Sequence, residues 1–398
     1  MLRKLRKRVP ILERMNAAWQ ARRQEKRARI GLAHYQLEAR KLGITCPAGA
    51  ELKAAVSARL AATGRAGIKA KPKGGLHLFL PYGVENWERV LPRSLAPFGE
   101  VSEFEWRSRG FNDSGSPATW VKVREEMNRE MWRAFEAAHA NRPVDVVCAY
   151  VSGYTVGPEI LRKMAGAGAV ILNFCYDDKV TFPGPLFGGR YASPASIADA
   201  VDLNLTCAPA CVVKYAVHGG LGMFWPEAAH PEVHRPYDVP FEFDAVLPGS
   251  GYGWRPRFVA ELRKLGIDAR GFGKGWPSGP LSDEELVRLY SRSRIVLGSG
   301  GIGHSRKLMC LKGRDFEVPM AGGLYLTSNN PELSLCFDVG KEILTYTDAA
   351  DCARTIRRLL DHPEEAAQIR QAGRERSLRD HTYEARWGEA FRMVGLLD

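Results

Sequence analysis

Long apolar runs, a secretory signal and paired cysteines are all missing from this sequence of 398 residues. No stretch approaches the ~20 consecutive apolar residues that a membrane-spanning helix needs. The basic residues 1–8 are followed by no apolar segment of the kind found in a signal peptide. The eight cysteines are scattered and form no Cys-x-x-Cys pair, which argues against a disulfide framework and a structural zinc site. We therefore expect a cytoplasmic protein with reduced thiols.

Acidic residues are few at the start of the chain, which is therefore strongly basic. Residues 1–29 contain eleven Lys or Arg and only two glutamates, whereas the net charge of the whole chain is +12. Residues 1–72 lack the alternation of a strand, and we expect a helical extension followed by a linker. The basic segment, residues 1–30, predicts binding to an anionic membrane surface. A solvated or self-associating helix is the alternative, and the rest of the chain lacks the broad basic surface of a nucleic-acid-binding protein.

Strands alternate with helices over residues 73–225. The short apolar run 76–81 predicts a buried strand, and further strands are predicted at 101–106, 144–150 and 169–175. Between the second and third of them, five apolar side chains recur at three- and four-residue steps, as on one face of a helix: Trp120, Val123, Met127, Met131 and Phe135. This alternation predicts a largely parallel, doubly wound sheet.

A proline-rich connection, residues 225–242, leads to a second α/β region, residues 243–380. Strands are predicted there at 243–247, 267–271, 294–297, 323–327 and 342–346. Ser282 and Glu285 form a capping box ahead of one helix, and Pro363 opens another. Residues 381–398 are predicted as a closing helix. Two such regions predict an α/β protein with two Rossmann-like domains, which bind ligands at the carboxyl ends of their strands.

Two glycine-rich segments follow predicted strands of the second region. The first, residues 249–255, includes Gly251 and Arg255, and the second, residues 298–304, includes Gly301 and His304. Glycines let backbone N–H groups approach a phosphate, and an arginine adds charge. The first segment lacks the G-x-G-x-x-G spacing of a dinucleotide site, so a tight structural turn is an equal alternative.

A cationic cluster with a single glutamate follows the second glycine-rich segment. Lys312 and Arg314 suit a pyrophosphate, and Glu317, among apolar neighbours, suits a ribose diol. A solvated helix face and an ion pair between Glu317 and Arg314 are the alternatives. The run from Lys312 to Thr327 resembles the donor-site signature of the CgeB-like (spore-maturation type) glycosyltransferases, relatives of glycosyltransferase family 4. Later segments agree with this resemblance: Glu332-Leu333, Gly340-Lys341-Glu342, 372–376 and 381–386.

The resemblance implies a GT-B enzyme, with two facing Rossmann-like domains, that uses a nucleotide-activated sugar. Glu317 matches the second glutamate of the family's E-x7-E motif, which binds the donor ribose there. The first glutamate is replaced by Met309. Lys312 and Arg314 would then neutralise the diphosphate leaving group. Since no Asp-x-Asp occurs in the chain, we expect neither a metal nor another cofactor.

Three residues are candidates for proton transfer or for orienting the reacting groups. Asp178, with Asp177 before it, follows a predicted strand, and His218 lies in a predicted loop. Either can orient an acceptor hydroxyl or act as a base, although a helix cap and a structural polar contact are the more ordinary roles. His304, beside the cationic cluster, can donate to leaving-group or sugar oxygens.

The sequence thus predicts transfer of a sugar from a nucleoside diphosphate sugar to a glycan, a lipid-linked glycan or a protein. A sugar-nucleotide epimerase of the same fold is one alternative and needs no acceptor. A non-catalytic assembly or coat protein that keeps the nucleotide-binding fold is another, because Met309 replaces a carboxylate. The predicted location is the cytoplasm, with residues 1–30 holding the protein at the inner membrane.

Overall fold

The computed structural model describes residues 10–83, 89–112 and 117–398, which form two compact units. The N-terminal unit consists of residues 29–226 and 384–398, and the C-terminal unit consists of residues 227–383 together with the chain up to Ala28. Helix α2 (Pro10–Lys41) therefore contributes to both units. A separate extension was predicted over residues 1–72 and a separate closing helix over residues 381–398. Each of these segments is divided between the two units, after Ala28 and after Tyr383 respectively.

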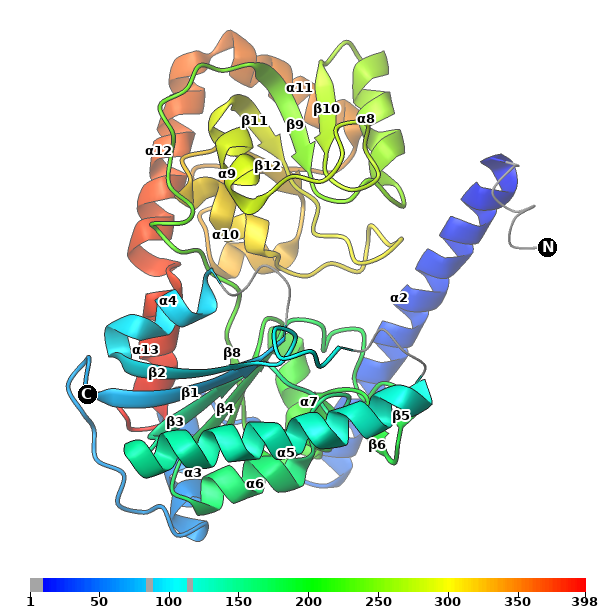
Figure 1. Cartoon of the computed structure of the whole chain (residues 1–398). Helices are drawn as coiled ribbons and strands as arrows, with labels where there is room; N and C mark the ends of the chain where they lie inside the picture. The colour runs from blue at the N-terminus through cyan, green and yellow to red at the C-terminus, as the bar shows by residue number, and fades with distance from the viewer. Residues whose placement is uncertain (1–9, 84–88, 113–116) are drawn as a thin grey trace. The chain divides into compact units, whose positions relative to one another are not determined.

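A sheet of six parallel strands forms the centre of the N-terminal unit, in the order β2-β1-β3-β4-β7-β8 (Figure 1). All residues of β1, β3, β4 and β7 are buried, as expected of parallel strands that are covered on both faces. The four strands predicted in this region are confirmed, whereas β7 and β8 were not predicted. The strands are β1 (Leu76–Tyr82), β2 (Gly99–Glu105), β3 (Val146–Ala149), β4 (Val170–Cys175), β7 (Leu203–Thr206) and β8 (Gly222–Phe224).

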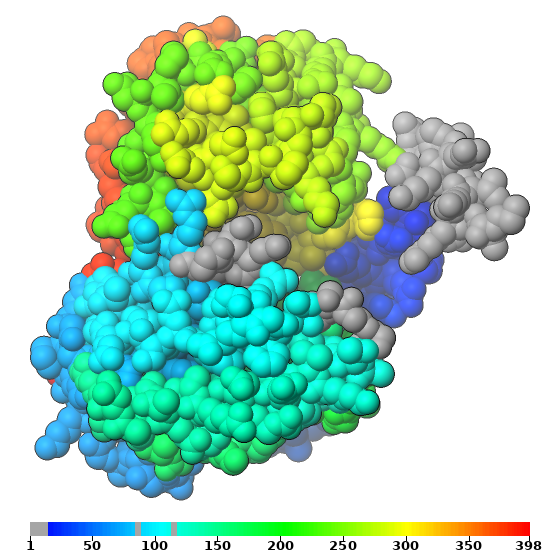
Figure 2. Space-filling view, viewed as in Figure 1, coloured from blue at the N-terminus to red at the C-terminus, as the bar shows by residue number. Residues whose placement is uncertain are grey.

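The predicted amphipathic helix is confirmed as α5 (Pro117–Asn141), which packs on this sheet beside α6 (Pro158–Gly166). Met127, Met131 and Phe135 are fully or almost fully buried, and the Phe135 ring meets that of Phe79 edge-on at 5.4 Å between centroids. The opposite side of α5 is charged and forms part of the surface of this unit (Figure 2). The remaining helices of the unit are α3 (Gly49–Ala62), α4 (Leu91–Leu95) and α7 (Val212–Val217).

Helix α13 (Tyr383–Met393) brings the end of the chain back to the core of the N-terminal unit. Trp387 on this helix is 0% exposed, and its ring centroid lies 4.7 Å from that of Trp225. Its indole Nε1–H donates a hydrogen bond of 3.1 Å to Ser94 Oγ. Residues nearly 300 positions earlier in the chain therefore depend on α13 for their packing.

The C-terminal unit has five parallel strands in the order β10-β9-β11-β12-β13. Phe258 and Leu262 of one helix and Ile356 of another are buried in a core with strand residues such as Leu297. The capping box of Ser282 and Glu285 and the helix start at Pro363 are confirmed. The strands are β9 (Phe243–Pro248), β10 (Ala269–Phe272), β11 (Ser293–Leu297), β12 (Tyr325–Ser328) and β13 (Leu344–Tyr346). The helices are α8 (Arg255–Lys264), α9 (Asp283–Ser291), α10 (Gly313–Met320), α11 (Ala349–Asp361) and α12 (Pro363–Asp380).

Helix α2 presents two different environments along its length. Tyr35 is 5% exposed, and its hydroxyl lies 3.2 Å from His218 Nε2 in the N-terminal unit. Earlier in the helix, Met15 is 64% exposed and Trp19 is 56% exposed. In the three described ranges, no helix combines the length and the apolar character that crossing a membrane requires.

Candidate functional site

The first glycine-rich segment forms a tightly held loop after β9. Gly249 has φ 111°, a conformation that favours glycine, and its N–H donates to Phe272 O at 2.8 Å. The indole of Trp276 donates to the Gly249 carbonyl, also at 2.8 Å. A Cβ atom at Gly249 would lie only 3.2–3.3 Å from the guanidinium of Arg314. The missing side chain therefore lets Arg314 lie against the carboxyl end of β9.

Gly251 stabilises this loop through an internal hydrogen bond, whereas a contact with phosphate was predicted for it. Its N–H donates to Lys274 O at 2.8 Å, so the group is already used within the protein. A Cβ atom there would lie 2.9 Å from both the Gly275 carbonyl oxygen and the Trp276 ring. The structure thus supports the alternative of a tight structural turn at Gly251.

Two arginines meet beside this loop. Arg255 begins α8, is 8% exposed and donates from Nη1 to Ser250 O at 3.0 Å. Burial and the nearby charge of Arg314 lower the pKa of Arg255. Burial opposes the charge of Arg314, but Tyr290, Tyr325 and Glu317 raise its pKa, so it stays protonated. Across the described part of the chain, the Arg314 guanidinium has no hydrogen-bond or ion-pair partner. Two neighbouring cations of this kind form a candidate site for a phosphate group.

Helix α10 positions the rest of the predicted cationic cluster. Asp315 accepts from the Lys312 N–H at 2.8 Å and from the Tyr325 hydroxyl at 2.8 Å, which fixes the first turn of the helix. Burial raises the pKa of Asp315 to about 6, although these hydrogen bonds oppose the shift. Arg314 lies in this turn and Glu317 three residues later, so both are held by the same short helix.

Glu317 has an acidic neighbour that the sequence did not reveal. A Cβ atom at Gly313 would lie 2.7 Å from Glu317 Oε1 and 2.7 Å from Glu227 Oε2, so the two carboxylates converge there. Burial and the charge of Glu317 raise the pKa of Glu227 to about 8. His234 Nε2 lies 3.9 Å from Glu317 Oε1. Glu227 comes from the proline-rich connection, and no pattern in the sequence links it to residues 313–317.

Unsatisfied polar atoms gather at the second glycine-rich segment, after β11. Ser299 Oγ, His304 Nδ1 and Asn330 Nδ2 are buried atoms without a hydrogen-bond partner among the described residues. Gly301 is buried, and a Cβ atom there would lie 2.4 Å from Ser305 O, which keeps the segment compact. Buried polar atoms without partners are costly, so a polar ligand at this segment is a natural explanation.

The two glycine-rich segments and α2 come together around His304. The His304 ring meets Tyr252 edge-on at 6.3 Å between centroids, and a Cβ atom at Gly253 would lie 3.5 Å from His304 Nδ1. From α2, Glu25 Oε1 accepts a hydrogen bond of 2.5 Å from Ser305 Oγ. The basic extension therefore contacts the candidate site through one of its few acidic residues.

The candidates in the N-terminal unit have structural surroundings. Asp178 is 0% exposed, and its Oδ2 accepts a hydrogen bond of 2.7 Å from the Tyr215 hydroxyl. Burial raises the pKa of Asp178 and lowers that of His218, whose ring contacts Phe182 and Tyr35. A buried carboxyl group cannot reach an acceptor hydroxyl. The geometry thus favours the structural alternatives for Asp178 and His218.

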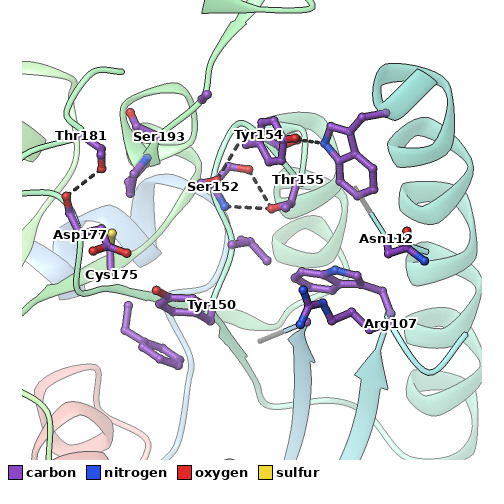
Figure 3. A pocket seen from close by; sticks show the side chains of 17 residues that line it. Arg107, Asn112, Tyr150, Ser152, Tyr154, Thr155, Cys175, Asp177, Thr181 and Ser193 are labelled. Atoms are coloured by element: carbon purple, nitrogen blue, oxygen red, sulfur yellow. Dashed lines mark hydrogen bonds between the residues drawn. The ribbon is translucent and has the colours of Figure 1, made fainter. Parts of the chain in front are cut away.

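Asp177, the neighbour of Asp178, is exposed and lines a pocket of about 260 Å³ (Figure 3). The pocket lies at the carboxyl ends of β1 to β4, where Gly83, Trp106, Tyr150 and Cys175 follow or end the strands. This is where open α/β sheets bind ligands. Of these lining residues, sequence reasoning pointed only to Asp177, through its place after a predicted strand.

Within residues 10–83, 89–112 and 117–398, no three His, Cys, Asp or Glu side chains are grouped in a way that could hold a metal ion. Glu227 and Glu317 are two converging carboxylates, and the charges of Lys312 and Arg314 act on this pair.

Comparisons with known proteins give a family match in the C-terminal part of the chain. Residues 255–392 match the model of a family described as glycosyl transferase-like. This segment contains Arg255, the second glycine-rich segment and α10. A comparison with curated protein sequences finds no significant match.

Several solved structures share the fold of most of this chain. Sucrose-phosphate synthase from Thermosynechococcus elongatus has a TM-score of 0.54 at 15% identity, over 80% of this chain and 99% of that one. Anabaena Alr3699/HepE in complex with UDP-glucose has a TM-score of 0.55 at 9% identity, over 81% and 100%. An α,α-trehalose-phosphate synthase (UDP-forming) from Burkholderia vietnamiensis has a TM-score of 0.51 at 12% identity, over 80% and 99%. The fold is GT-B, as expected, and the CgeB-like type stays a prediction.

Proposed function

We propose that this protein is a glycosyltransferase that uses a nucleoside diphosphate sugar as donor. The observation that carries the proposal is that two guanidinium groups lie at the loop that follows β9: that of Arg314 beside Gly249, and that of Arg255 on the Ser250 carbonyl. They lie within the segment that matches the glycosyl transferase-like family, close to the glutamate predicted to bind ribose. A diphosphate between the arginines and a ribose at Glu317 would satisfy both groups at once.

In the proposed reaction, the bond between the anomeric carbon and the β-phosphate oxygen breaks. A bond from the same carbon to an acceptor hydroxyl oxygen forms, the hydroxyl proton leaves to a base or to water, and a nucleoside diphosphate is released. Arg255, Arg314 and Lys312 would stabilise the negative charge on this leaving group, a role that a divalent metal fills in other enzymes. His304 would donate to an oxygen of the leaving group or of the sugar.

A uridine nucleotide is the donor to test first, since a structure similar to this fold was solved with UDP-glucose. We expect a thermal-shift panel of nucleotides and nucleotide sugars to single out one base. A ligand at one hundred times its dissociation constant adds roughly 2.7 kcal/mol to the free energy of unfolding. The enzyme should then release nucleoside diphosphate from that donor in the presence of chelator.

The same panel separates transfer from the two alternatives. Nucleotide binding without release of diphosphate, with any acceptor offered, would favour a non-catalytic protein of this fold. Conversion of the donor to an epimer without an acceptor would favour an epimerase. If no nucleotide or nucleotide sugar shifts the unfolding temperature, the proposal is wrong.

We also propose that the N-terminal part of α2 docks on an anionic membrane surface and keeps the enzyme at the inner side of the cytoplasmic membrane. Trp19 and Met15 are more than half exposed, and basic side chains surround them along the helix. A basic residue near an anionic leaflet contributes on the order of 1 kcal/mol, and apolar insertion adds to this. A lipid-linked acceptor would be met at such a surface.

A further inference from the structure

The pocket of the N-terminal unit is built from rigid aromatic walls. A Cβ atom at Gly83 would lie 2.1 Å from the Trp106 indole, so this ring is seated where a side chain is missing. The Trp120 ring stacks on Tyr154 at 5.6 Å between centroids, and its Nε1–H donates to Tyr154 O at 3.0 Å. These contacts hold the indoles and phenols in place before any ligand arrives.

Short polar groups alternate with these aromatic faces around the pocket (Figure 3). Ser152 and Thr155 lie side by side on one part of the wall and Thr181 lies near Asp177, and each hydroxyl has a hydrogen bond within the protein that fixes its position. Asp177 differs from them, since its carboxylate forms no hydrogen bond or ion pair with a described side chain. An exposed, unpaired acceptor of hydrogen bonds thus faces a wall of aromatic rings and hydroxyls, to which Arg107 adds the guanidinium of one cationic residue.

The volume of the pocket and the chemistry of its lining limit the class of ligand that it can hold. At about 260 Å³, the pocket falls just below the ~300–1,000 Å³ of sites that enclose drug-sized ligands, so it suits one ring rather than a whole nucleotide sugar. A sugar ring carries C–H groups on its faces and hydroxyls around its edge. Aromatic walls match the faces, while a carboxylate and hydroxyls match the edge. An acyl chain would leave Asp177 and the hydroxyls without partners.

Resting on the proposed glycosyl transfer, we propose that this pocket holds a single sugar ring of the acceptor, with Asp177 accepting a hydrogen bond from one of its hydroxyls. The acceptor is therefore a carbohydrate, and the enzyme extends or caps a glycan. Selection of the acceptor depends on the N-terminal unit alone and is separate from nucleotide recognition by residues of the C-terminal unit.

The test measures sugar binding to the full chain by saturation-transfer-difference NMR. The probes are methyl glycosides of the common hexoses and N-acetylhexosamines, with decyl phosphate and a Ser/Thr-rich peptide as the other two chemistries. At least one glycoside should show saturation transfer. Asp177→Ala should weaken its binding roughly tenfold or more, as expected for a lost hydrogen bond to a charged group.

Two variants fill the pocket and one controls for them. Ala192→Trp and Thr181→Trp place an indole at lining residues and should abolish glycoside binding. Leu186→Trp adds the same ring at a nearby residue that is 68% exposed and does not line the pocket, and it should bind like the unmodified chain. Using two filling variants keeps the test valid if one of them fails to fold.

The outcomes of the test separate this inference from the proposed function. If the protein binds a nucleotide but no glycoside, or if the filled variants bind glycosides normally, the sugar site is wrong and the donor site stands. If decyl phosphate or the peptide binds instead and is blocked by both filling variants, the acceptor belongs to that class. If glycosides bind and no nucleotide does, the transferase is wrong and the sugar site stands.

Discussion

Replacing Arg314 by alanine should remove affinity for phosphate while leaving the fold intact. The guanidinium has no hydrogen-bond or ion-pair partner among the described residues, so the substitution breaks no internal hydrogen bond or ion pair. It also relieves the repulsion with Arg255. The expected loss is in the free energy of ligand binding, because a hydrogen bond to a charged group contributes about 1.5–3 kcal/mol. At about 1.4 kcal/mol per factor of ten, the dissociation constant for UDP should rise roughly tenfold to a hundredfold.

Calorimetric titration of UDP and of uridine measures this effect, because only UDP carries the diphosphate. Uridine binding should change by less than about twofold. Arg257→Ala is the matched control: it removes the same charge from an exposed position on α8, two residues after Arg255. Equal weakening of UDP and uridine, or an equal effect of Arg257→Ala, would refute the assignment of Arg314 to the diphosphate.

Four further predictions concern other residues. Glu317→Ala should abolish nucleotide binding with little loss of stability, and unchanged calorimetric affinity would contradict the ribose assignment. Burial raises the pKa of Glu227 to about 8, so the folded state holds a proton that the unfolded state releases near pH 4.5. The free energy of unfolding should therefore fall as the pH rises from about 4.5 to 8, and Glu227→Gln should flatten this slope in denaturant titrations. Trp387→Ala should cost about 3–5 kcal/mol of stability, whereas the exposed Glu389→Ala should change it by less than about 0.5 kcal/mol. The full chain should sediment with vesicles of phosphatidylglycerol and phosphatidylethanolamine and be released by high salt, whereas a chain that begins at Ile30 should not; full-length protein left in the supernatant at low salt would exclude membrane docking.

Most strands of both sheets could be predicted because their signal is local. Residues 170–175, for example, are apolar except for Asn173, and the strand is buried on both faces. Strand β7 was missed because two of its four buried residues, Asn204 and Thr206, are polar. Asn204 Nδ2 donates to the carbonyls of Ala198 and Leu221, both at 3.0 Å, and these partners are brought to it only by the fold.

The site could be predicted where its residues are close in sequence. Lys312, Arg314 and Glu317 were found because one short helix holds them. Glu227 lies 90 residues before Glu317, and only the folded chain brings their carboxylates together. Asp177 and Asp178 are difficult to tell apart from the sequence because they are adjacent and both follow β4. In the structure, Asp177 lines the pocket, whereas Asp178 is buried.

The path of the chain through Trp387 has a consequence for how the protein is made. During synthesis, an N-terminal domain usually folds while later domains are still being translated. Here the core of the N-terminal unit lacks the Trp387 indole until residues 384–398 have left the ribosome, by which time residues 227–383 are already available to fold. The N-terminal unit is therefore completed only after the C-terminal unit has been synthesised. Until then, Trp225 and Ser94 lack their contacts with Trp387.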